Sequence, residues 1–212
     1  MKWGEKSFPF LLLLLLLFLW THIFGILMFV WHSIVLLQVD QFLRTYIAEK
    51  QNRKSTHLLA VIILSSVQVT WFYLNYAGEH IWNYLVFLPV HLPLEFWNCV
   101  WIIVTNDLMI RFIVIGVKGI VMLLSGGFSN QSRQKRFFTL LESWSQLYRE
   151  VLPASVWIRF YLAVQGGESG TTMGYLLAMM YSIFKVKSLQ SVLQYCHAVT
   201  ISAVWNDTVS IV

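Results

Sequence analysis

The stretch FPFLLLLLLLFLWTHIFGILMFVWHSIVLLQV, residues 8–39, determines the class of this 212-residue chain. None of its 32 residues carries a formal charge. A helix that crosses the hydrocarbon core of a bilayer needs about 20 apolar residues, and helices in soluble cores are usually shorter than this stretch. The stretch therefore predicts that the chain is embedded in a membrane.

The composition of the whole chain supports this prediction. Hydrophobic residues make up 58% and charged residues 12% of the sequence, whereas a soluble domain carries about 25% charged residues. The net charge is +5, but the basic residues cluster in short segments between apolar ones, at 44–54, 133–136 and 185–187. That placement is typical of topology signals and of contact with anionic lipid head groups. We expect membrane lipids as partners, and no nucleic acid.

The apolar segments predict an all-α fold, a polytopic transmembrane helix bundle of about five to six membrane segments. A straight helix over residues 8–39 would be about 48 Å long, against a hydrocarbon core of about 30 Å. We therefore expect a break near Thr21, His22 and Gly25, which divides this stretch into two short spans. The expected spans are residues 8–20, 23–39, 58–77, 95–124 and 173–185.

Residues 133–152 have a different pattern. Apolar side chains recur at i, i+3, i+4 and i+7, and charged or polar ones take much of the remainder. This pattern predicts an amphipathic helix that lies on the membrane surface and ends at Pro153. The multi-span membrane domain would then cover residues 1–187, followed by a divergent tail over residues 188–212.

The topology depends on residues 95–124, which are long enough for one steep span or for two short ones divided near Asn106. We place the N-terminus and the basic loop 40–57 in the cytosol. If residues 95–124 then form one span, the basic helix over residues 133–152 also lies in the cytosol, in agreement with the positive-inside rule. Two spans would place that helix in the lumen, where the sequon Asn130-Gln131-Ser132 is usable for glycosylation. We favour the cytosolic placement.

One group of charged residues falls within an expected span. Asp107, Arg111 and Lys118 lie within about 40° of one another on a helical face. Charges at membrane depth normally face the interior of a bundle and pair with other groups. This face either lines a path for a substrate or for protons, or it holds an internal Asp107–Arg111 ion pair. In the second interpretation Lys118 extends to the membrane–water interface. The second interpretation is favoured.

No other group of residues forms a catalytic or cofactor site. The sequence has no nucleophile elbow, no P-loop and no dinucleotide-binding fingerprint. Its two cysteines, Cys99 and Cys196, lie far apart in sequence and predict no metal site. No catalytic, cofactor-binding or metal-binding residue is therefore assigned.

Several stretches together resemble the RING finger and transmembrane domain-containing family. The family consists of endoplasmic-reticulum E3 ubiquitin ligases with a multi-span membrane domain followed by a cytosolic RING. The resemblance covers about residues 3–187. It is carried by Lys6–Phe10, Glu49–Ser55, Leu85–Pro89, Leu94–Ile103 with Asp107, Leu140–Leu152 with Pro153, Trp157 and Arg159, and Gly174–Lys187.

The chain departs from the family after Lys187. A RING binds two zinc ions through eight Cys or His ligands, and residues 188–212 offer only Cys196 and His197. No zinc-ligand position of the family can be carried over, and zinc is expected only in the relatives that bear a RING. The tail looks like that of an alternatively spliced or truncated product, so we expect no ligase activity from this chain alone.

The resemblance implies a multi-pass protein of the endoplasmic-reticulum membrane, involved in the disposal of misfolded proteins (ERAD). As a form without a RING, it would bind substrates or partners, including relatives that carry a RING and the degradation machinery. Two alternatives remain open. The chain is a small transporter or lipid-handling protein that uses the face of Asp107, Arg111 and Lys118, or it is a scaffold with no connection to ubiquitin.

Overall fold

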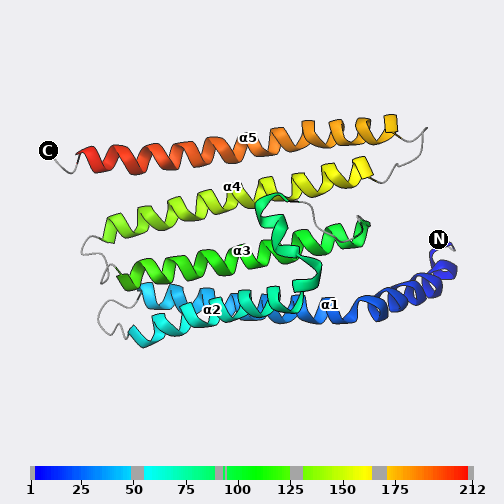
Figure 1. The fold of residues 1–212 in the computed structure, drawn as a ribbon, viewed down its shortest axis with the longest axis horizontal. Helices are drawn as coiled ribbons and strands as arrows, with labels where there is room; N and C mark the ends of the chain where they lie inside the picture. The colour runs from blue at the N-terminus through cyan, green and yellow to red at the C-terminus, as the bar shows by residue number, and fades with distance from the viewer. Residues whose placement is uncertain are drawn as a thin grey trace.

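The computed structural model describes residues 3–48, 55–88, 93, 95–124, 131–163 and 171–209. These residues form five α-helices and two short 3-10 helices, with no strand among them. In Figure 1 the five α-helices run lengthwise beside one another and alternate in direction. The predicted all-α class is confirmed for these residues, whereas the number of membrane spans stays a prediction. The elements are α1 (Trp3–Ala48), α2 (Ser55–Asn75), η1 (Ala77–Glu79), η2 (Ile81–Val86), α3 (Phe96–Leu124), α4 (Gln131–Ala163) and α5 (Thr171–Val209).

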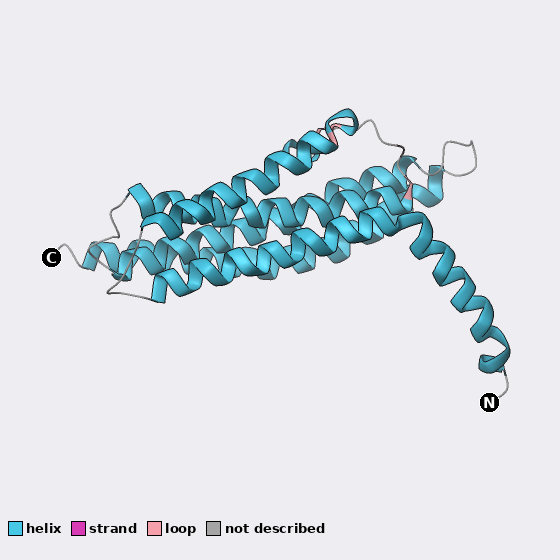
Figure 2. Cartoon of the chain, turned by 90° about the horizontal axis from the view of Figure 1, so that it is seen from below, coloured by secondary structure: helices cyan, strands magenta, loops and turns pink. Residues whose placement is uncertain are grey.

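The first helix is continuous, so the expected break near Gly25 does not occur. α1 contains 46 residues, which corresponds to about 69 Å. A break inside lipid would leave backbone groups without hydrogen bonds, whereas a continuous helix satisfies all of them internally. The Thr21 hydroxyl also bonds within the helix, to the carbonyl oxygens of Leu17 and Phe18. The excess length is accommodated in another way, since the N-terminal part of α1 turns away from the other helices (Figure 2).

By length and hydropathy, two helices of the described chain are apolar enough to cross a membrane. These are Ser7–Ile47 within α1 and Thr56–Asn75 within α2. The run from Leu11 to Leu17 is exposed along its whole length, as a surface that faces lipid would be.

A shared core joins α1, α2 and α3. Close packing between α2 and α3 depends on two glycines of α3, because Gly116 faces Ser65 and Gly119 faces Ile62. Such small residues allow the backbones of membrane helices to approach each other. α3 is one helix over its 29 residues, so no break occurs near Asn106. The buried core residues are Val35, Leu36, Val39, Leu43, Leu58, Val61, Phe72, Leu108, Met109, Phe112, Ile115 and Met122.

The connection from α2 to α3 crosses α3 and reaches α4 (Figure 1). The Tyr148 hydroxyl of α4 donates to the Leu85 carbonyl oxygen, and Arg159 donates to the Phe87 carbonyl oxygen at 2.6 Å. Tyr84 is buried in a small cluster with Cys99 and Val156. These contacts fix α4 against α3 through a segment that belongs to neither helix.

The fourth helix packs lengthwise between α3 and α5 (Figure 1). Its predicted place on the membrane surface stays a prediction. α4 also continues through Pro153, where we expected its end. A proline inside a helix removes one backbone donor, but burial of Leu152 and Val156 on either side of it favours continuation. The polar side chains Ser143 and Ser145 are buried as well, because α4 is covered on two sides.

The fifth helix is longer than expected. We placed the end of the last span at Lys185, but α5, which has 39 residues in all, continues past Lys185 to Val209. Lys185 does not terminate the helix because its ammonium group pairs with Glu150 of α4, with 2.6 Å between Nζ and Oε2. Further along, the Cys196 thiol donates to the Ser143 carbonyl oxygen at 3.1 Å. Residues 188–209 are therefore helical.

Candidate functional site

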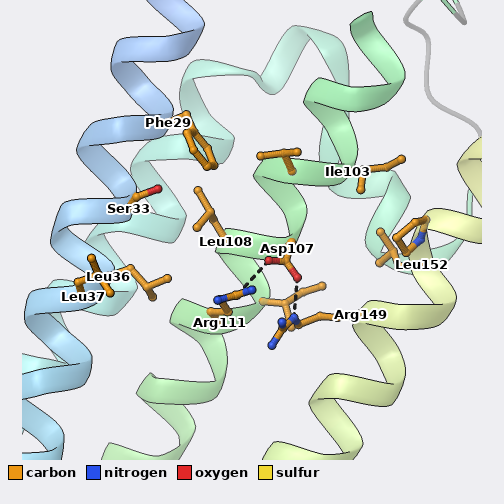
Figure 3. A pocket seen from close by; sticks show the side chains of 13 residues that line it. Phe29, Ser33, Leu36, Leu37, Ile103, Asp107, Leu108, Arg111, Arg149 and Leu152 are labelled. Atoms are coloured by element: carbon orange, nitrogen blue, oxygen red, sulfur yellow. Dashed lines mark hydrogen bonds and ion pairs between the residues drawn. The ribbon is translucent and has the colours of Figure 1, made fainter. Parts of the chain in front are cut away.

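The predicted polar face centres on Asp107, which binds two guanidinium groups (Figure 3). Arg111, one turn further along α3, donates from Nε to Asp107 Oδ2 at 2.9 Å. Arg149 of α4 donates from Nε to Asp107 Oδ1 at 2.5 Å. Two positive charges thus share one carboxylate, and among the described residues neither arginine pairs with a second one.

The third residue of the predicted face has a partner of its own. Lys118 of α3 pairs with Glu142 of α4, instead of extending alone to the interface. The Lys118 side chain is only 14% exposed, whereas that of Glu142 is 54% exposed. This pair and the Asp107–Arg149 pair together connect α3 to α4 at two levels.

A cavity of about 400 Å³ lies beside these ion pairs, between α1, α3 and α4 (Figure 3). We call it the central cavity. Asp107, Arg111 and Arg149 form its polar wall. The remaining wall is almost wholly apolar, with Ser33 as its one uncharged polar member. The other lining residues are Phe29, Leu36, Leu37, Ile103, Val104, Leu108, Ile110, Leu152 and Pro153.

A second cavity of about 160 Å³ adjoins the first and shares Leu36, Leu37, Arg111 and Arg149 with it. We call it the charged cavity, because Asp40, Arg44, Lys118 and Glu142 also line it. On α1, Arg44 pairs with Asp40, at 2.7 Å between Nε and Oδ2.

Over the two cavities, four cationic side chains face three carboxylates. The cations are Arg44, Arg111, Lys118 and Arg149, and the anions are Asp40, Asp107 and Glu142. The lining therefore carries one excess positive charge. Such a site is suited to an anionic group, since charge-assisted hydrogen bonds from guanidinium groups are strong.

The favoured interpretation of the face predicted the Asp107–Arg111 pair but did not identify its partners on α4. Glu142 and Arg149 were assigned only to the charged and polar positions of the predicted amphipathic helix over residues 133–152. One signal could have identified Glu142 but not Arg149: within its expected span, α3 carries the two cations Arg111 and Lys118 and the one anion Asp107, so a balancing anion was to be expected from another helix.

Cys196 and His197, the only Cys and His residues of the tail 188–212, do not fit the role of RING zinc ligands. Cys196 and His197 are adjacent in α5, so they point to different sides of the helix. The Cys196 thiol is buried and bound to a backbone carbonyl. Among the described residues, no group of three or more His, Cys, Asp or Glu side chains is arranged to bind a metal.

The long apolar helices are typical of one class, the α-helical membrane proteins. The resemblance to the RING finger and transmembrane domain-containing proteins is confirmed by related proteins that match most of the chain. No family model and no solved structure matches it.

Three relatives illustrate the relationship. E3 ubiquitin-protein ligase RNFT1 of Mus musculus is 27% identical over 193 residues, which cover 87% of this chain and 48% of the relative. RNFT1 of Homo sapiens is 26% identical over 192 residues, with 87% and 43% covered. RING finger and transmembrane domain-containing protein 2 of Pongo abelii is 24% identical over 186 residues, with 86% and 41% covered.

The chain thus spans less than half the length of these relatives. Their names describe transmembrane proteins, which agrees with the apolar helices of this chain. The chain is accordingly a membrane protein.

Proposed function

We propose that these 212 residues are the membrane domain of an E3 ubiquitin ligase of the endoplasmic-reticulum membrane, which acts in the disposal of misfolded proteins. The observation that carries the proposal is the match, over 86–89% of the chain, to relatives that are named E3 ubiquitin-protein ligases. The proposed domain is multi-pass. Its role is to bind substrates or related chains through its membrane helices.

Transfer of ubiquitin would require a RING that these residues do not supply. The two zinc ions of a RING would support the fold that recruits a charged ubiquitin-conjugating enzyme. Cys196 and His197 do not fit that ligand set, because they follow each other on α5 and the thiol is bound to Ser143. We therefore propose that these residues bind partners, and that a RING outside them performs the transfer.

The ion pairs between α3 and α4 support a role in partner binding. Association of helices within lipid depends on close packing and on polar contacts, because lipid removes the usual hydrophobic driving force. The central cavity exposes such polar groups beside an apolar wall. A single side chain of a partner could therefore make both kinds of contact at this place.

The proposal is tested by affinity purification of the tagged chain from gently solubilised membranes. We expect a relative with a RING and ubiquitin-conjugating enzymes to co-purify with it, and the chain to lie in the endoplasmic reticulum. A matched control is an unrelated membrane protein with the same tag at the same expression level. A stable chain in that membrane that recovers neither partner would contradict the proposal.

A second candidate function is that of a small transporter or lipid-handling protein, which the central cavity beside Asp107 and Arg111 favours. Separate replacement of Asp107, Arg111 and Lys118 distinguishes the two. A transporter would lose flux while it stays folded, whereas a structural role would appear as lower stability or abundance.

A further inference from the structure

A third cavity extends the line formed by the charged and central cavities along the groove between α1 and α3. It measures about 360 Å³ and shares Phe29 and Val104 with the central cavity. We call it the apolar cavity, because no charged residue lines it. Its walls on α3 include Trp97 and Trp101, and Gly25 of α1 lies against the Trp101 ring.

The three cavities follow one another along α1 and α3. On each helix one row of lining residues recurs in steps of three or four, which is the spacing of a single helical face, and further lining residues flank this row. On α3 the face spans about 32 Å, close to the thickness of the hydrocarbon core, about 30 Å. The positions on α1 are Phe18, His22, Gly25, Phe29, Ser33, Leu36, Asp40 and Arg44, and those on α3 are Trp97, Trp101, Val104, Leu108, Arg111, Ile115 and Lys118.

Polarity changes in one direction along this groove. The charged cavity holds the excess positive charge, and Arg111 and Arg149 stand at its junction with the central cavity. From Phe29 and Val104 onward no Asp, Glu, Lys or Arg lines the groove, and the polar residues Thr21, His22 and Asn98 stand among apolar and aromatic ones. One end of the groove is therefore suited to an anion and the other end to a hydrocarbon chain.

We propose that this groove binds a phospholipid with an anionic head group. Its phosphate lies against Arg111 and Arg149, and an acyl chain extends past Val104 into the apolar cavity. Guanidinium groups match the geometry of phosphate oxygens. The Nε atoms of both arginines bind Asp107, and no other side chain in the described part of the protein binds their terminal amino groups, which are placed to bind the phosphate. Burial of the chain against apolar side chains adds hydrophobic stabilisation.

The size and charge of the groove favour this occupant over others. A helix with its side chains has a diameter of about 10 Å, whereas cavities of about 400 and 360 Å³ have the volume of a small-molecule site. The excess positive charge favours a lipid with net negative charge over a zwitterionic one. The inference does not depend on a connection to ubiquitin, because it rests on the cavities and their charges.

The test uses the purified full chain in nanodiscs that contain phosphatidylcholine alone or mixed with phosphatidic acid. Native mass spectrometry of the released protein counts the lipid molecules that each chain retains. We expect selective retention of one phosphatidic acid. Arg111→Gln and Arg149→Gln should each weaken retention about tenfold, because each removes a charge-assisted contact with the phosphate.

Lys187→Gln is the matched control for charge. It removes one positive charge from an exposed position of α5 that lines none of the three cavities. Retention of phosphatidic acid by this variant should equal that of the original chain. A loss as large as that of the arginine variants would overturn the proposal, since it would show that net charge alone recruits the lipid.

A second pair of variants tests the position of the acyl chain without changing any charge. Val104→Phe narrows the junction between the central and apolar cavities and should reduce retention several-fold. Ile113→Phe adds the same ring type at an exposed position of α3 outside the cavities and should not reduce it. This pair keeps the proposal testable if loss of an arginine unfolds the chain. Equal retention of both lipids, or wild-type retention by Val104→Phe, would overturn the proposal.

Discussion

Arg149 of α4 donates from Nε to Asp107 Oδ1 of α3 at 2.5 Å, which connects residues 42 positions apart in the sequence. The same carboxylate accepts a bond from Arg111. Asp107 therefore neutralises one of two guanidinium groups that face the central cavity, and its charge holds α3 and α4 together at this level.

The first prediction concerns this carboxylate. Asp107→Asn would leave Arg111 and Arg149 close together without a counter-charge, so we expect the free energy of unfolding to fall by about 1–2 kcal/mol. The loss stays below that of a fully buried pair because the Asp107 side chain is 32% exposed. Thermal unfolding in detergent measures it. Asp40→Asn serves as the control, since it breaks an exposed pair within α1 and should cost less than about 0.5 kcal/mol.

The second prediction concerns the contact between Lys118 and Glu142. Glu142→Lys would place two ammonium groups together and destabilise the chain by about 1 kcal/mol, a small effect because Glu142 is largely exposed. The double exchange Lys118→Glu with Glu142→Lys should recover most of that loss. A double-mutant cycle on thermal stability measures the coupling. A coupling energy of zero would show that the contact contributes nothing to the packing of α4.

The helices could be predicted from the sequence more reliably than their ends. Residues 58–77 were expected to be helical, and α2 covers Ser55–Asn75, because an uninterrupted apolar segment leaves no other way to satisfy its backbone in lipid. The break near Gly25 and the end at Pro153 were wrong for a common reason. Both relied on local backbone preferences, which packing against neighbouring helices or the surrounding lipid overrides.

The candidate site could be predicted only in part, for a related reason. Asp107 and Arg111 are four positions apart on one helix, so local geometry was sufficient to pair them. Arg149 and Glu142 reach the site only because α4 packs along α3. That packing depends on contacts between distant segments, such as the bond from Tyr148 to Leu85, and sequence periodicity does not encode them.

The third prediction compares two glycines on the same face of α3. A Cβ atom at Gly119 would lie 2.9 Å from Ile62 Cγ1, whereas one at Gly116 would meet Ser65 Cβ at 3.7 Å, an ordinary contact. Gly116→Ala should be neutral or stabilising by up to about 1 kcal/mol, because alanine favours helix. Gly119→Ala should be less stable than Gly116→Ala by about 1–3 kcal/mol, because α2 has to shift. Equal thermal stabilities for the two variants would contradict the close approach of α2 and α3.

The fourth prediction concerns the hydrogen bond from the Tyr73 hydroxyl to Asn106 Oδ1, which measures 2.9 Å. Asn106 is fully buried, so Tyr73→Phe would leave its amide oxygen without this donor. We expect a loss of about 1–2 kcal/mol in the free energy of unfolding. Tyr175→Phe is the control, because Tyr175 is exposed on α5 and should change stability by less than about 0.5 kcal/mol. Unfolding of both variants under identical detergent conditions gives the comparison.

The last prediction concerns topology and follows from the continuity of α3. Because α3 is one helix, its C-terminal end lies at the same end of the bundle as the start of α2 (Figure 1). Since α1 is continuous, the N-terminus and the basic loop 40–57 lie at opposite ends of it, and they do not both face the cytosol as we expected. If the loop 40–57, with the larger number of basic residues, faces the cytosol, the C-terminal end of α3 faces it too. The sequon at Asn130 follows α3, so we expect no glycan there. Treatment with an endoglycosidase should leave the electrophoretic mobility of the chain unchanged.

A sequon introduced after α2, near Gly78 at the opposite end, should acquire a glycan in the same cells. A glycan at Asn130 would show that the proposed orientation of the bundle is inverted.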